Sequence, residues 1–88
     1  MAQQTWAFLG GKQVPEEEAV VGVKTHALHY GTAVFEGIRG NWNERLGKVV
    51  IFRLREHYER LIRGCQILRI NLPYSVDELC KITTELLE

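Results

Sequence analysis

The chain has 88 residues, of which 45% are hydrophobic and 25% charged, and its formal net charge is zero. This length fits one small domain, and the composition is that of a globular protein. A balanced charge gives no electrostatic footprint for nucleic acid or an anionic membrane, and no apolar run approaches the roughly 20 residues that cross a bilayer. No basic segment followed by an apolar one marks the N-terminus, so the sequence predicts a cytoplasmic protein.

The cysteines and histidines are too few to predict a disulfide framework or a metal site. Cys65 and Cys80 do not belong to a Cys/His cluster with zinc spacing. Both fall on inward faces of predicted helices, where a thiol is typically inert. His26 and His29 lie three apart, which on a helix would place them on one face, but no third ligand stands at a helical offset.

The first quarter of the chain has the pattern of a β-hairpin followed by a connector. Two short runs, residues 6–9 and 12–14, flank a Gly-Gly pair, and this arrangement is typical of a hairpin. The acidic run at 16–18 indicates a solvated turn. The apolar residues 19–23 fit either a short strand or an extended connector.

The chain is organised around residues 25–39, which read THALHYGTAVFEGIR. We predict a strand over 33–39, with Phe35, Gly37 and Arg39 on one face and positions 34, 36 and 38 on the other. The first face combines an aromatic wall, a gap without a side chain and a cation, which suits a small-molecule pocket. The alternative is a half-buried strand in which Arg39 reaches solvent and Gly37 marks a bulge.

A hairpin loop at 41–47 and a further strand at 48–53 are predicted to follow the strand at 33–39. Residues 41–47 are polar and end in glycine, which indicates the loop, although Trp42 is unusual there. Residues 48–53 contain an unbroken apolar row, and such a row is typical of a strand covered on both faces.

A helix over residues 55–69 carries the second candidate site residue. Its apolar stripe consists of Tyr58, Leu61, Ile62, Cys65 and Leu68. Arg60 lies on a border strip with His57, Gly64 and Ile67, and Gly64 leaves space one turn further on. An arginine beside such a gap is suited to bidentate binding of a phosphate. The alternative is an arginine that covers apolar surface with its stem.

The last helix has a clear beginning and no clear end. Pro73 stops the preceding helix, and Ser75 with Glu78 matches a capping box, so the second helix is predicted to run from Val76. Neither a glycine, a proline nor a basic last turn precedes Glu88. We therefore expect the chain to be a piece of a longer protein.

The residues alone do not predict a catalytic group. The sequence contains no glycine-rich phosphate loop, no nucleophile elbow and no carboxylate pair placed for acid–base chemistry. Its four lysines lie at turns, connectors, strand starts or helix surfaces, whereas a Schiff-base lysine needs a desolvated or charge-tuned pocket. This reasoning reaches an α+β domain with half a pocket.

Three stretches together resemble a known family. They are THALHYGTAVFEGIRG at 25–40, VVIFRLREH at 49–57 and YERL at 58–61. They closely resemble the N-terminal domain of branched-chain aminotransferases, which are fold type IV pyridoxal-phosphate enzymes. The resemblance covers nearly the whole chain. It implies one truncated domain, residues 1–88, with an α+β fold in which helices pack on one face of a small antiparallel sheet.

The resemblance also implies a function and a set of site residues. The family transfers an amino group reversibly between valine, leucine or isoleucine and 2-oxoglutarate in branched-chain amino acid biosynthesis. Arg60 matches the arginine that binds the phosphate of pyridoxal 5'-phosphate, and Phe35 and Gly37 match residues of the side-chain pocket. Tyr30 matches a tyrosine given to the neighbouring subunit's pocket, which implies a homodimer or higher homo-oligomer, and Arg39 has a supporting role.

The resemblance leaves the reactive amine outside this chain. The Schiff-base lysine of the family lies in a C-terminal domain beyond residue 88, so we expect the chain alone to be inactive. A D-amino-acid aminotransferase or an aminodeoxychorismate lyase is an alternative, although FEGIR at 35–39 argues against both. A small non-catalytic domain that binds a partner through an uncovered sheet is a further alternative.

Overall fold

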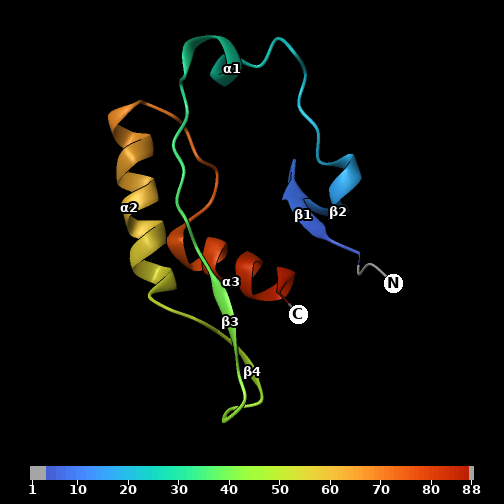
Figure 1. The fold of residues 1–88 in the computed structure, drawn as a ribbon. Coiled ribbons are helices and arrows are strands. Elements are labelled where there is room, and N and C mark those ends of the chain that lie inside the picture. Colours follow the sequence, from blue (N-terminus) through green and yellow to red (C-terminus); the bar gives the residue numbers. More distant parts are fainter. Residues whose placement is uncertain (1–3, 88) are drawn as a thin grey trace.

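The computed structural model describes residues 4–87 as two β-hairpins and three α-helices (Figure 1). Their bounds are β1 Trp6–Leu9, β2 Lys12–Pro15, a 3-10 helix at Glu16–Glu18, α1 His26–Tyr30, β3 Gly40–Asn43, β4 Lys48–Ile51, α2 Leu54–Ile67 and α3 Val76–Leu86. The predicted α+β class is confirmed. The antiparallel pairing is divided between two separate two-stranded sheets, β1–β2 and β3–β4.

The first hairpin forms where the Gly-Gly pair predicts it. β1 pairs with β2 in a register that runs from Trp6 opposite Pro15 to Leu9 opposite Lys12. Gly10 and Gly11 have φ angles of +62° and +87°, which a residue with a Cβ rarely adopts. Residues 19–23 then form an irregular connector, which leads to α1.

The strand predicted over residues 33–39 is wrong, but its two faces are confirmed. The segment runs extended beside α2 (Figure 1) and hydrogen-bonds to no neighbouring strand within residues 4–87. Burial nevertheless alternates along it, with positions 34, 36 and 38 half-buried and Phe35, Gly37 and Arg39 exposed. A strand needs a partner for its backbone groups, and none of the described strands pairs with this segment.

The two long helices begin and end close to their predicted bounds. The capping box at the start of α3 is confirmed: Glu78 N donates to Ser75 Oγ, and Ser75 N donates to Glu78 Oε1, both at 3.1 Å. α2 stops because Arg69 adopts a left-handed conformation, with φ +59°. α3 ends at Leu86, and a continuation of the helical pattern at Glu88 lies outside the described residues.

Helices α2 and α3 pack through the apolar stripe of α2 and a few polar contacts. Cys65 of this stripe is buried, and Cys80 of α3 is half-buried. Tyr58 Oη donates to Thr83 Oγ1, since that hydroxyl itself donates to the Leu79 carbonyl. Just before α3, the ring of Tyr74 meets the ring of Phe8 in β1 edge-to-face, with 6.0 Å between the ring centroids.

The described part of the chain has a small core and a large apolar surface. Of its hydrophobic side chains, Val14 and Cys65 are classed as buried, whereas Val23, Phe35 and Ile67 are more than three-quarters exposed. β4 is not covered on both faces, because Val49 and Val50 remain exposed. The radius of gyration is 14.8 Å, against about 12 Å for a compact domain of this length. No described helix is long and apolar enough to cross a membrane.

Candidate functional site

Among residues 4–87, the side chain with the most side-chain hydrogen bonds is that of Glu36, on the inward face of the extended segment. Its carboxylate receives Arg60 Nε on Oε2 and Arg60 Nη2 on Oε1, both at 2.6 Å. His57 Nδ1 donates to the same Oε1 at 2.7 Å. His57 and Arg60 are three residues apart on α2, so they lie on one face of the helix. The Glu36 side chain is only 9% exposed.

These contacts fix the charge of Glu36. The hydrogen bond from Arg60 is the largest cause, followed by that from His57, and together they lower the pKa of the Glu36 carboxyl from 4.5 to about 2. Burial acts in the opposite direction and is outweighed. The same bond raises the pKa of Arg60. The two residues therefore form an ion pair throughout the neutral range.

Acid is expected to weaken the fold through Glu36. Because the folded-state pKa is about 2 and the ordinary value is 4.5, the stabilisation is complete above pH 4.5 and is lost as the pH falls towards 2. Glu36→Gln should flatten this dependence in urea denaturation followed by circular dichroism between pH 2 and 6. The matched change Glu59→Gln on the exposed face of α2 should preserve it, and equal slopes for wild type and Glu36→Gln would contradict the assignment.

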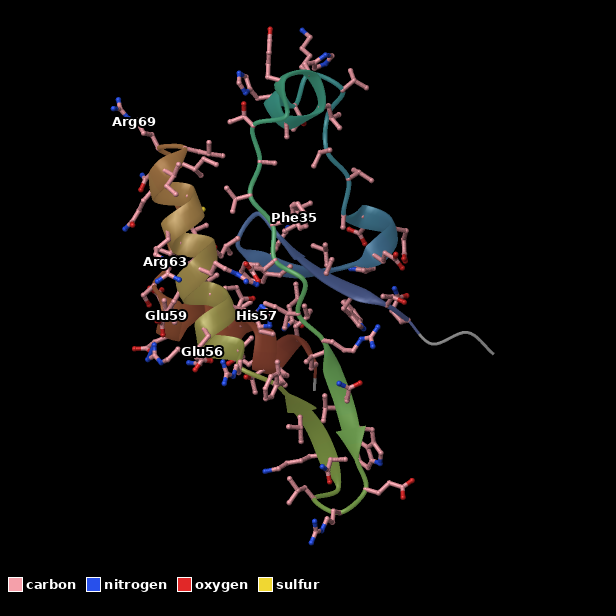
Figure 2. All side chains as sticks on the ribbon, turned by 60° about the vertical axis from the view of Figure 1, so that its left-hand side comes forward. Phe35, Glu56, His57, Glu59, Arg63 and Arg69 are labelled. Atoms are coloured by element: carbon pink, nitrogen blue, oxygen red, sulfur yellow. The ribbon has the colours of Figure 1, made fainter. Side chains whose placement is uncertain are left out.

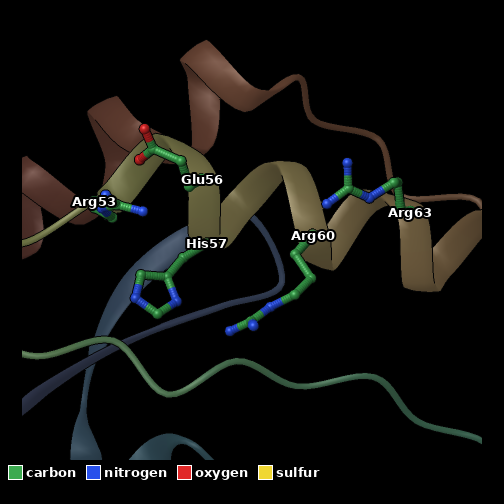
Figure 3. A pocket seen from close by; sticks show the side chains of 5 residues that line it. All are labelled: Arg53, Glu56, His57, Arg60 and Arg63. Carbon is green, nitrogen blue, oxygen red and sulfur yellow. The ribbon is translucent and has the colours of Figure 1, made fainter.

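Arg60 and His57 also line an open, positively charged hollow. Its volume is 280 Å³, and the side chains around it are Arg53, Glu56, His57, Arg60 and Arg63. They come from the cap and the first three turns of α2, and Figure 3 shows His57 and Arg60 reaching from the helix towards the extended segment. Three guanidinium groups are opposed here by two carboxylates, that of Glu56 and that of Glu36 on Arg60, so the hollow keeps a net positive charge and favours a small anion.

The predicted pocket wall is exposed. Phe35 is 89% exposed, and Figure 2 shows it on the extended segment. Gly37 and Arg39 share its face, and a Cβ placed on Gly37 would meet nothing within 4 Å. Tyr30 ends α1, is largely exposed, and has its ring 4.4 Å from that of His26. The structure thus brings Phe35, Gly37 and Arg39 together on one accessible surface.

Arg60 does not join this surface within the described residues. It bonds to Glu36, whose side chain projects from the face of the segment opposite to that of Phe35. The space predicted beside Gly64 is also wrong, because Val34 fills it: a Cβ on Gly64 would lie 2.9 Å from Val34 Cγ1. The absence of a side chain at Gly64 therefore allows the extended segment to approach α2 closely.

Sequence reasoning missed the role of Glu36, His57 and the hollow's other arginines. The alternation along the segment places position 36 on the face opposite Phe35 and assigns it no role. The border strip of α2 indicates Arg60 alone as a site residue. A usable signal is present, since an inward carboxylate needs a cationic or hydrogen-bonding partner. The border strip of α2 supplies two such partners in His57 and Arg60.

The two histidines of α1 have structural contacts. His29 Nε2 donates to the Val23 carbonyl at 2.6 Å, and the ring of His26 stacks on Tyr30. Among residues 4–87, no group of three or more His, Cys, Asp or Glu side chains is placed to hold a metal ion.

Comparison with known proteins gives one consistent result, although no family model matches the chain. A probable branched-chain-amino-acid aminotransferase of Aquifex aeolicus is 49% identical over 82 residues, which are 93% of this chain and 26% of the relative. The branched-chain-amino-acid aminotransferase of Escherichia coli K12 is 47% identical over 74 residues, or 84% of this chain and 23% of that protein. The chain thus spans about a quarter of the length of these curated relatives.

Solved structures agree with the sequence comparison. The branched-chain aminotransferase of Thermoproteus uzoniensis, solved with norvaline, superposes with a TM-score of 0.87 at 43% identity, over 96% of this chain and 28% of that one. The Thermobaculum terrenum enzyme, solved in its pyridoxal-phosphate form, gives 0.81 at 38% identity, over 94% and 27%. The chain is therefore homologous to branched-chain-amino-acid aminotransferases, and over its described residues it has the fold of the corresponding quarter of these enzymes.

Proposed function

We propose that this chain is the N-terminal domain, residues 1–88, of a pyridoxal-phosphate-dependent branched-chain aminotransferase. The parent enzyme moves an amino group between valine, leucine or isoleucine and 2-oxoglutarate. Within it, the chain supplies an anchor for the cofactor phosphate and part of the wall of the substrate side-chain pocket. The protein acts in the cytoplasm as a homodimer or higher homo-oligomer.

The observation that carries the proposal is the exposed guanidinium of Arg60 in a hollow with two further arginines. A phosphate monoester carries close to two negative charges and several acceptor oxygens, which match paired N–H groups from arginine. His57 lines the same hollow. The residues present therefore fit the phosphate of the cofactor, which when bound supplies the electron sink for amino-group transfer.

The exposed face of the extended segment supports the second part of the proposal. Phe35 offers an apolar surface to a branched side chain, and Gly37 leaves room for a ligand to approach the backbone. Arg39 provides a cation at the end of this face. Tyr30 would complete the pocket of a neighbouring subunit, and its exposure leaves it available for that role.

Solved relatives with similar folds contain an amino acid or a form of the pyridoxal cofactor. The Thermoproteus uzoniensis aminotransferase was solved with norvaline, a straight-chain amino acid. The Thermobaculum terrenum enzyme was solved in its pyridoxal-phosphate form, and a further branched-chain aminotransferase was solved with pyridoxamine 5'-phosphate. Sequence identities of 38–43% support similar ligands for the protein that contains this chain.

The phosphate anchor is tested with a pair of ligands that differ in one group. Pyridoxamine 5'-phosphate and pyridoxamine share the ring, and neither has an aldehyde that would react with the lysines. We expect the chain to bind the phosphorylated ligand at least tenfold more tightly in a titration followed by ¹⁵N NMR, with Arg60 among the shifted resonances. Equal affinity for the two ligands would contradict the anchor and would favour a non-catalytic, partner-binding domain.

The chain alone is expected not to transaminate. All four lysines, Lys12, Lys24, Lys48 and Lys81, are exposed, whereas a Schiff-base lysine needs a desolvated pocket to be reactive near neutral pH. A steady-state assay with valine and 2-oxoglutarate should show no turnover by the 88-residue chain. Turnover under these conditions would show that the reactive amine lies within it.

A further inference from the structure

The guanidinium of Arg60 has two usable edges, and Glu36 occupies one of them. The side edge carries Nε–H and one Nη2–H, and both donate to Glu36 at 2.6 Å. The end edge carries Nη1–H and the second Nη2–H, and it makes no hydrogen bond to any residue between 4 and 87. Each edge matches the spacing of two oxygens on a carboxylate or a phosphate. Arg60 can therefore bind two oxyanions at once.

Glu36 is held more firmly than Arg60. The Glu36 side chain is 9% exposed and has a third bond from His57, whereas the Arg60 side chain is 65% exposed. Displacing Arg60 from Glu36 would leave a carboxylate in a largely covered position with only His57 as partner, which is costly. An incoming anion therefore meets the end edge more easily than it displaces the carboxylate.

We propose that Arg60 binds the phosphate through its end edge while its side edge stays on Glu36, so that Glu36 is the positioning residue of the phosphate site. This inference rests on the function proposed above and assigns to Glu36 and His57 a role in it. The hydrogen bond from His57 holds the Glu36 carboxylate in place. The carboxylate in turn holds the plane of the Arg60 guanidinium, which sets the direction in which its end edge points. The ligand class is a phosphate monoester or free phosphate, since both present the same oxygens.

A positioning role for Glu36 predicts a change in phosphate affinity of opposite sign to the change that net charge alone predicts. Removing a negative charge beside an anion site should by itself strengthen anion binding. If Glu36 positions Arg60, its loss instead frees a long side chain that must be ordered again on binding. Ordering one such side chain typically reduces affinity by about two- to tenfold. Glu36→Gln should therefore weaken phosphate binding, whereas Glu59→Gln, which removes a charge from the exposed face of α2, should leave it equal or slightly stronger.

The decisive measurement uses the unmodified chain. In NMR titrations with pyridoxamine 5'-phosphate and with inorganic phosphate, the Arg60 Nη resonances should shift while Arg60 Nε and the Glu36 carboxyl carbon stay in place. A phosphate that displaces Glu36 would shift all three, and this result would overturn the inference while leaving the phosphate anchor intact. A response to pyridoxamine 5'-phosphate alone would show that the ring must accompany the phosphate, and would overturn the assignment of free phosphate as a ligand.

The variants give a second, independent outcome. The ratio of affinities for pyridoxamine 5'-phosphate and pyridoxamine should fall about two- to tenfold in Glu36→Gln and be equal or slightly higher in Glu59→Gln. Since both ligands are measured on the same variant, a general loss of fold would change both affinities and not their ratio. An unchanged ratio in Glu36→Gln would refute the positioning role. If Arg60 responds to neither phosphate ligand even in wild type, the anchor itself fails and the inference with it.

Discussion

Replacing Arg60 by alanine is expected to remove nearly all preference of the chain for a phosphorylated ligand. The end edge of Arg60 offers two charge-assisted hydrogen bonds, each contributing roughly 1.5–3 kcal/mol. Their loss predicts that the phosphate-dependent affinity falls at least tenfold, and by about a hundredfold if both bonds contribute fully. The measurement is the ratio of dissociation constants for pyridoxamine 5'-phosphate and pyridoxamine, obtained by NMR titration.

Two further variants separate geometry from charge. Arg60→Lys keeps the positive charge, but an ammonium has no planar fork that holds two oxyanions side by side, so most of the preference should still be lost. Arg45→Ala removes an arginine from the turn between β3 and β4, outside the hollow, and should leave the ratio unchanged. If Arg60→Lys bound phosphate as tightly as wild type, charge and not edge geometry would explain the site.

Local patterns predict those features that depend on neighbours in the sequence. The capping box at Ser75 follows from residues three apart, and the first hairpin follows from the conformational freedom of Gly10 and Gly11. The alternation of burial at Phe35 and its neighbours is also predictable, because an extended backbone turns alternate side chains to opposite sides whether or not it pairs. These signals place Phe35 and position 36 on opposite faces of the segment and Arg60 at a helix border.

Contacts across the fold are not predictable in the same way. The residues of the 33–39 segment suit a strand, but strand formation depends on a partner supplied from elsewhere in the structure. Likewise, the space beside Gly64 is visible in the helical pattern, yet what fills it is not. Alternation places Glu36 on the correct face, and only the approach of the segment to α2 shows that Arg60 and His57 hold it.

The contact between Val34 and Gly64 is expected to determine how closely the extended segment approaches α2. An alanine in a helix is normally about 1 kcal/mol more stable than a glycine. Here its Cβ would lie 2.9 Å from Val34 Cγ1, and overpacking of this kind costs typically about 1–3 kcal/mol. Gly64→Ala is therefore expected to lower the free energy of unfolding in wild type but to raise it by about 1 kcal/mol in a Val34→Ala background.

A double-mutant cycle on Val34 and Gly64, measured by urea denaturation, isolates this contact from helix propensity. A coupling energy of about 1–3 kcal/mol is expected, as is typical of residues in direct contact. The same cycle reports on the site, since Glu36 lies two residues from Val34 and its position depends on how closely the segment approaches α2. In Gly64→Ala the pKa of the Glu36 carboxyl should rise from about 2 towards 4.5 as its bonds to Arg60 and His57 lengthen. Additive energies with an unchanged Glu36 pKa would mean that the segment is held in place by something other than the Val34–Gly64 contact.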